Sequence, residues 1–95
     1  GFKVPHMGWN EVHRSQESLL TAGLNELVPK PDRPRFYFVH SYYVKVKNES
    51  NSILTTKYRH EFDSAIQNDN IYGAQFHPEK SHKFGIQLFK NFAEL

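Results

Sequence analysis

The chain contains no cysteine among its 95 residues. Within these residues, that absence excludes disulfide bonds, zinc sites built on thiolates, and any reaction in which a thiolate attacks a substrate. If this chain takes part in thiol chemistry, the thiol must come from a different stretch of polypeptide.

Long apolar runs and an excess of one charge are also absent. No uninterrupted apolar stretch approaches the ~20 residues that a membrane-spanning helix requires. Twelve Lys and Arg residues face ten Asp and Glu residues, for a formal net charge of +2, and the two signs are interspersed. Basic side chains that bind nucleic acids or membrane surfaces usually cluster. We therefore expect neither a nucleic acid nor a membrane as a partner, and we expect a cytoplasmic location.

Aromatic side chains, by contrast, are abundant. They make up 15% of the chain, and hydrophobic residues as a whole make up 38%. This composition predicts a packed core rather than a disordered chain. The aromatic residues concentrate in two segments, 36–43 and 71–92. Because a chain of this length buries only a modest core, the clustering indicates a core that further polypeptide completes.

The order of apolar and turn-forming residues predicts mostly strands, followed by one helix. After an extended segment over residues 1–12, leucine spacing predicts a short helix over 15–27, capped by Ser15 or Ser18. Runs of strand-forming residues separated by turns predict four strands, at 35–47, 53–58, 62–67 and 71–76.

The closing helix is the clearest element of the pattern. Ser81 is a suitable helix cap, and polar residues, Asn91 among them, occupy the sides away from the apolar stripe. The strand at 36–44 is apolar on both faces, which predicts cover on both sides. One helix covers only one face of a sheet, so we interpret the chain as part of a larger α/β unit. The stripe consists of Phe84, Leu88, Phe92 and Leu95.

The residues most suited to catalysis lie at the end of the last predicted strand. His77 ends that strand, and Glu79 follows two residues later. Residues i and i+2 of an extended segment point the same way, so the carboxylate can orient the imidazole, while Pro78 stiffens the backbone between them. On spacing alone, an ordinary surface pair is the commoner interpretation.

The sequence around this pair resembles a known signature. Residues 73–79, GAQFHPE, are similar to the motif G-x-Q-F-H-P-E of class I (triad) glutamine amidotransferases. The resemblance implies a flavodoxin-like α/β domain in which a cysteine attacks the amide of glutamine. It also implies that His77 is the base and acid of the triad and that Glu79 orients it. No cofactor is implied.

Other segments resemble the glutaminase subunits of imidazole glycerol phosphate synthases. They are residues 5–10 (PHMGWN), 38–42 (FVHSY) and 80–85 (KSHKFG). The family's cysteine elbow belongs to its N-terminal half and does not occur here. The resemblance therefore implies that residues 1–95 are the C-terminal portion of a single glutamine amidotransferase domain, with the nucleophile-bearing half absent.

The same resemblance assigns a substrate pocket and a partner surface. The backbone around Ser41 and Tyr42 would help to hold glutamine, although without the resemblance an ordinary place in a strand is the commoner interpretation of both. A second set would face a (β/α)8-barrel synthase subunit. For Trp9 a place in the core is an equal alternative, and for Lys80 a solvated position is the common case. The residues that match partner-facing positions are Pro5, Met7, Trp9, Asn10 and Lys80.

The resemblance implies a glutaminase that passes ammonia to a synthase, with histidine biosynthesis as the expected pathway. This chain by itself is expected to be inactive because it lacks the thiol. Two alternatives stay open: a paralogous subunit that supplies ammonia for surface-polysaccharide sugars, and a non-catalytic module derived from the fold. A metal site formed by His77, Glu79 and His82 is not expected, because their spacing fits no standard site. The isolated chain is also expected to self-associate or to require its missing half.

Overall fold

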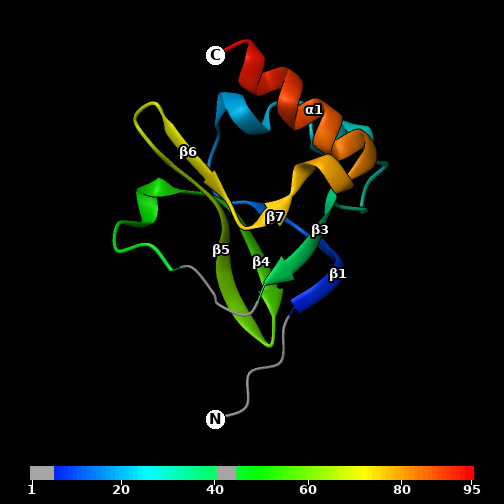
Figure 1. Cartoon of the computed structure of the whole chain (residues 1–95), viewed down its shortest axis with the longest axis horizontal. Coiled ribbons are helices and arrows are strands. Elements are labelled where there is room, and N and C mark those ends of the chain that lie inside the picture. Colours follow the sequence, from blue (N-terminus) through cyan, green and yellow to red (C-terminus); the bar gives the residue numbers. More distant parts are fainter. Residues whose placement is uncertain (1–5, 41–44) are drawn as a thin grey trace.

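A computed structural model describes residues 6–40 and 45–95 of the chain. It is a mixed α/β structure with two antiparallel sheets and one helix at the C-terminal end (Figure 1). In Figure 1, helix α1 (His82–Ala93) lies at one end of the molecule, and the hairpin of β4 and β5 reaches toward the other. Every strand pairing among the described residues is antiparallel.

The first sheet positions the candidate site. It contains β1 (His6–Glu11), β3 (Arg35–His40) and β7 (Phe76–His77), in the order β1-β3-β7. Because side chains alternate across a strand, Phe36 and Phe38 of β3 point into the core, whereas Tyr37 and Val39 point to the opposite face.

The second sheet is larger and has the order β2-β4-β5-β6. Arg59 joins β4 to β5 with φ of 69°, and Asp69 lies between β5 and β6 with φ of 55°, so both turns use the left-handed region. A buried hydrogen bond of 3.0 Å from Thr56 Oγ1 to Ser64 Oγ links β4 with β5. The strands are β2 (His13–Arg14), β4 (Ser52–Tyr58), β5 (His60–Asn68) and β6 (Ile71–Ala74).

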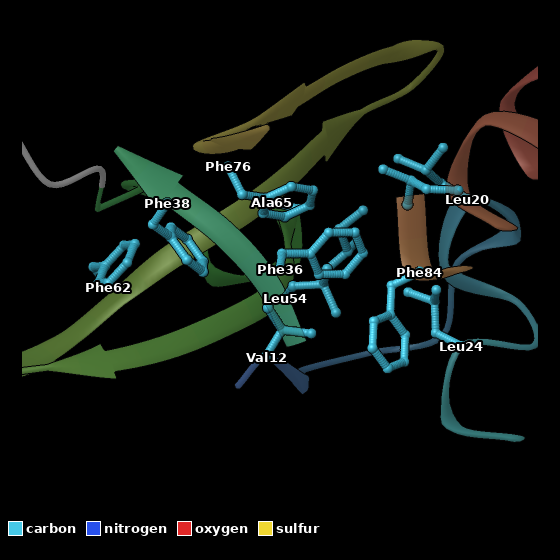
Figure 2. Close-up of a cluster of buried hydrophobic side chains, with 12 residues drawn as sticks. Val12, Leu20, Leu24, Phe36, Phe38, Leu54, Phe62, Ala65, Phe76 and Phe84 are labelled. Carbon is cyan, nitrogen blue, oxygen red and sulfur yellow. The ribbon is translucent and has the colours of Figure 1, made fainter. Parts of the chain in front are cut away.

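The hydrophobic core lies between the two sheets and the helix. Figure 2 shows its side chains running from Phe62 and Phe38 at one end to Leu24 and Phe84 at the other. Phe36 stacks on Phe76 with ring centroids 4.0 Å apart, which ties β3 to β7. The buried apolar residues are Val12, Leu20, Leu24, Phe36, Phe38, Ile53, Leu54, Phe62, Ala65, Phe76, Phe84 and Leu88.

The predicted strands are largely present, with changes at their ends. The strand expected at 71–76 is interrupted at Gln75, so β6 and β7 belong to different sheets. The strand expected at 62–67 extends to His60–Asn68. The strand expected at 35–47 stops at His40 before residues 41–44, which lie outside the described part of the chain, and residues 45–47 are not in a strand.

Within the described residues, the strand beginning near residue 36 is covered on one face only, and cover of its other face by further polypeptide stays a prediction. One face of β3 is fully buried, but Val39 on the other face is 40% exposed. Its neighbours on β1, Met7 and Trp9, are also exposed. Among the described residues, His82 stacks on Trp9 and Lys80 lies near the Tyr37 ring on this face, while Met7 and Val39 stay exposed.

The helix predicted over 15–27 is also absent. In its place are two short 3-10 turns, η1 (Leu19–Thr21) and η2 (Asn25–Leu27). Ser18, one of the two expected caps, does accept a hydrogen bond from the backbone N–H of Leu20. Gly23 has φ of 80°, a conformation that a continuous helix does not allow. Two further 3-10 turns are η3 (Glu49–Asn51) and η4 (Pro78–Lys80).

Helix α1 forms where it was predicted, but its buried side differs from the expected apolar stripe. Phe84 and Leu88 are buried, whereas Phe92 and Leu95 are about half exposed. Asn91, expected on a polar side, is buried, and its amide donates to the carbonyl oxygens of Leu20 at 2.8 Å and Ala22 at 2.7 Å. The helix therefore docks on η1 through a polar residue as well as through its apolar side.

No helix among the described residues is long and apolar enough to cross a membrane.

Candidate active site

His77 is held in place by the short strand that precedes it. Phe76 anchors β7 in the core, and Tyr37 of β3 lies directly opposite His77 in the strand register. Pro78 then begins the 3-10 turn η4, where its fixed φ suits the first position. The chain leaves the sheet at His77, so the imidazole stands at the border between core and solvent.

Glu79 contacts His77 directly. The distance from His77 Nδ1 to Glu79 Oε1 is 3.1 Å, and the two side chains are 42% and 55% exposed. An ionised carboxylate only accepts hydrogen bonds, so this contact places the proton on Nδ1 and leaves Nε2 able to accept a proton. The predicted geometry, with both side chains on the same side and within hydrogen-bond distance, is confirmed. The catalytic roles of the two residues remain a prediction.

Aromatic side chains lie on the outer face of the first sheet, beside this pair. Trp9 lies opposite Tyr37 in the register of β1 and β3, and their rings meet edge to face with centroids 6.1 Å apart. The other side of Trp9 stacks on His82, at 5.5 Å and an interplanar angle of 8°. Lys80 Nζ lies 6.0 Å from the centre of the Tyr37 ring. Three segments far apart in sequence thus form one continuous surface beside His77.

The structure brings together some of the residues assigned to the partner surface and separates others. Met7, Trp9 and Lys80 are exposed on or beside the outer face of the first sheet. Asn10 points to the opposite face of β1, where its amide donates to the carbonyl oxygen of Lys57 at 3.1 Å. Pro5 lies outside the described residues.

The residues assigned to the glutamine pocket, Ser41 and Tyr42, also lie outside the described part of the chain. The segment that follows them is anchored, because the buried carboxylate of Asp63 accepts a hydrogen bond of 2.8 Å from the backbone N–H of Val46. Sequence reasoning missed this contact, since nothing in the pattern of β5 distinguishes Asp63 from a solvent-facing residue.

Tyr37 and Val39 were also missed as members of the surface around His77. Val39 lies opposite Met7 and Tyr37 opposite Trp9 in the strand register. The i, i+2 alternation of β3 could have placed both on one face, but the register with β1 could not be read from the sequence.

Among residues 6–40 and 45–95, no group of three His, Cys, Asp or Glu side chains is arranged to hold a metal ion. His77 and Glu79 form an imidazole–carboxylate couple through their direct contact. Such a couple can orient a ring and move a proton at Nε2, and it requires a nucleophile from elsewhere to form a triad.

Comparison with known proteins agrees with the motif. The family model for class I glutamine amidotransferases matches residues 1–95. A relative from Pseudomonas aeruginosa, named imidazole glycerol phosphate synthase subunit HisH 2, is 53% identical over 93 residues, which cover 98% of this chain and 43% of that protein. A relative of the same name from Methanococcus maripaludis is 55% identical over 91 residues, covering 96% of this chain and 42% of that protein.

A third relative, imidazole glycerol phosphate synthase subunit HisH from Bdellovibrio bacteriovorus, is 45% identical over 95 residues, covering 100% of this chain and 44% of that protein. The chain thus spans less than half the length of each of these relatives. Its full-length match to the family model, together with these identities, shows that the chain belongs to the class I glutamine amidotransferase family.

Proposed function

We propose that the protein containing this chain hydrolyses glutamine to glutamate and ammonia through a Cys-His-Glu triad. The observation that carries the proposal is the 3.1 Å contact between His77 Nδ1 and Glu79 Oε1, inside a segment that matches the family's motif. Residues 1–95 would supply two members of the triad. The cysteine would come from the part of a single domain that corresponds to the remaining length of the relatives.

The chemistry assigns a defined task to each side chain. His77 takes the proton of the cysteine thiol, and the resulting thiolate attacks the amide carbon of glutamine to form a tetrahedral intermediate. His77 donates a proton to the departing nitrogen, so ammonia leaves and a thioester remains. His77 then takes a proton from water, the hydroxide attacks the thioester, and glutamate and thiol are released. Glu79 keeps the ring oriented and stabilises its protonated form, and no cofactor is needed.

Glutamine itself would be held in part by the backbone around Ser41 and Tyr42. The family resemblance supports this role, and both residues lie outside the part of the chain that the structure describes.

The partner would be a synthase subunit with a (β/α)8-barrel fold, and ammonia would pass to it. The relatives are named as subunits of imidazole glycerol phosphate synthase, which supports a synthase partner and a role in histidine biosynthesis. The barrel fold of the partner is assigned by the family resemblance alone, and the cytoplasmic location stays an expectation. The surface formed by Met7, Trp9 and Lys80 combines exposed apolar area with a cation, as is common at interfaces. Pro5 and Asn10 are assigned to the same interface by the family resemblance alone.

A second candidate is a paralogous subunit that provides ammonia for amination of surface-polysaccharide sugars. The relatives from Pseudomonas aeruginosa and Methanococcus maripaludis, at 53% and 55% identity, both carry the number 2 in their names. The relative from Bdellovibrio bacteriovorus, at 45% identity, carries no number. That pattern favours a second version of the subunit. Genome neighbourhood discriminates the two candidates, since histidine genes favour the first and sugar-modifying genes the second.

The non-catalytic alternative rests on the missing cysteine. A full reading frame with a Gly-x-Cys-x-Gly elbow upstream of these residues favours the enzyme. A frame that lacks such an elbow favours the binding module.

The direct test measures ammonia release from glutamine by the product of the full reading frame, with its synthase partner present. We expect His77→Ala to lower turnover by about 10²- to 10⁴-fold, the usual contribution of general acid–base catalysis. The matched control is His60→Ala, an exposed histidine in the β4–β5 hairpin, which we expect to leave turnover unchanged. Equal activity of both variants would contradict the proposed function.

The 95-residue chain alone provides a second test. We expect no glutamine turnover, because the nucleophile is absent and its loss from a triad costs many orders of magnitude. Ammonia release by the pure chain that His77→Ala abolishes would show that another group acts as the nucleophile.

A further inference from the structure

Ser81 does not act as the helix cap that its position suggests. It directly precedes helix α1, but its side chain makes no capping hydrogen bond to that helix. Instead, the fully buried hydroxyl donates to the carbonyl oxygen of His77 at 2.6 Å and accepts from the backbone N–H of Tyr37 at 3.0 Å. The hydroxyl therefore bridges β3 to the last residue of β7.

This bridge acts at the carbonyl group of His77. Tyr37 and His77 lie opposite each other in the strand register, and β7 is only two residues long. A strand this short has few ladder hydrogen bonds of its own to fix its end. Because the Ser81 hydroxyl both donates and accepts a hydrogen bond, it fixes the peptide plane between His77 and Pro78.

Gly85, in the first turn of helix α1, packs against the next peptide group, which joins Pro78 to Glu79. A Cβ atom at Gly85 would overlap with the carbonyl oxygen of Pro78, so the first turn of α1 packs directly on that carbonyl. The backbone N–H of Gly85 also donates to the carbonyl oxygen of Ser81 at 3.3 Å. Any side chain larger than hydrogen here would have to push the Pro78–Glu79 peptide away from the helix.

We propose that Ser81 and Gly85 form a backbone clamp that positions His77 and Glu79 for the triad, so that both are positioning residues for the reaction. This inference rests on the proposed glutaminase function. His77 and Glu79 are each about half exposed, and their own packing therefore does little to hold them. Ser81 and Gly85 hold the carbonyl groups of residues 77 and 78, and this backbone sets the orientation of the two side chains.

The test compares three variants of the full-length protein in complex with its partner: Ser81→Ala, Gly85→Ala and the control Ser64→Ala. Ser64 is as fully buried as Ser81, but its hydroxyl accepts a hydrogen bond from Thr56 of β4 and makes no contact with the carbonyl groups of residues 77 and 78. Steady-state ammonia release gives kcat and KM for glutamine, and thermal unfolding gives the stability of each variant. His77→Ala is measured alongside them.

We expect Ser81→Ala and Gly85→Ala to lower kcat by about tenfold to a hundredfold, the cost of misplacing a catalytic group by about 1 Å, with KM nearly unchanged. Ser64→Ala should lose comparable thermal stability and keep its kcat. The inference is overturned if both clamp variants fold and retain the kcat of Ser64→Ala. It is equally overturned if neither folds while Ser64→Ala does, since the pair would then serve folding alone.

The His77→Ala measurement separates the clamp from the triad assignment on which it rests. If that variant keeps full turnover, the proposed function fails whatever the clamp variants do. If it is inactive and the clamp variants behave like Ser64→Ala, the triad assignment survives and only the clamp is refuted.

Discussion

At the residue scale, the candidate chemistry depends on how one carboxylate holds one imidazole. Glu79 follows His77 by two residues, inside the 3-10 turn that begins at Pro78, and its carboxylate reaches the Nδ1 atom of His77. The sequence predicted this contact from an extended i, i+2 geometry, whereas the structure forms it across a turn. The contact was predictable because the two residues are close in sequence.

Glu79→Gln tests this contact in the full-length enzyme. The amide keeps the size of the side chain but no longer stabilises a protonated ring and can favour the wrong tautomer, so we expect kcat to fall by about 10²- to 10⁴-fold. Ammonia release from glutamine is the measurement. Glu61→Gln, an exposed carboxylate in the β4–β5 hairpin, is the matched control and should have no effect. Normal turnover of Glu79→Gln would remove Glu79 from the triad.

At the scale of elements, the sequence predicted which helices and strands exist better than it predicted where they begin and end or which of their faces are buried. β4, β5, β6 and α1 lie where strand-forming runs and helical spacing placed them. The segment 15–27 failed because Leu20 and Leu24 reach the core from two 3-10 turns separated by Gly23, whose φ of 80° breaks the helical path. Apolar spacing alone does not distinguish these arrangements.

The face of α1 was misjudged for a different reason. Asn91 fits a solvent-facing position by polarity, but the carbonyl groups of Leu20 and Ala22 approach the helix at that point and accept its hydrogen bonds. A buried polar group is stable when partners satisfy it. The partners come from η1, whose position relative to the helix could not be read from either segment.

Asn91→Ala tests this docking contact. The change leaves the buried carbonyl oxygen of Leu20 and the part-buried one of Ala22 without this donor, and we expect the free energy of unfolding of the full-length protein to fall by about 1–3 kcal/mol. Urea unfolding followed by circular dichroism measures the effect. Lys90→Ala, on the exposed side of the same helix, should change stability by less than about 0.5 kcal/mol. Equal stability of the two variants would show that Asn91 does not hold the helix.

At the scale of the whole molecule, the described residues leave apolar surface on two sides. One lies around Met7, Trp9 and Val39 on the first sheet, and the other lies where β6 meets α1. On the second side an apolar hollow is bordered by Tyr72, Phe89 and Phe92, with the rings of Tyr72 and Phe92 edge to face at 6.3 Å. The exposed large apolar residues are Met7, Trp9, Leu19, Val39, Ile71, Ile86, Phe89, Phe92 and Leu95.

We predict that the isolated 95-residue chain associates with itself or folds stably only with its missing half. Soluble monomers seldom expose contiguous apolar patches beyond roughly a few hundred Å². Size-exclusion chromatography with light scattering at several concentrations measures the association. Addition of the remaining polypeptide of the full reading frame should suppress it. A monomer with a cooperative thermal transition would contradict the prediction and would show that these residues complete their own core.

The sequence by itself determined what depends on neighbouring residues and on residue type. It established the absence of a thiol, the family motif at residues 73–79, the main strands, and the approach of Glu79 to His77. These features depend mainly on residue type and on residues that are close in sequence.

Only the tertiary structure decided which partners the remaining polar and aromatic groups find. The Ser81 hydroxyl bridges Tyr37 and His77 instead of capping α1, and Trp9 contacts both Tyr37 and His82. Each of these outcomes depends on the register of β1, β3 and β7, which brings together segments from both ends of the chain. The partner of a hydrogen bond or ring contact is the group that packing places next to it, and a local sequence pattern does not specify that group.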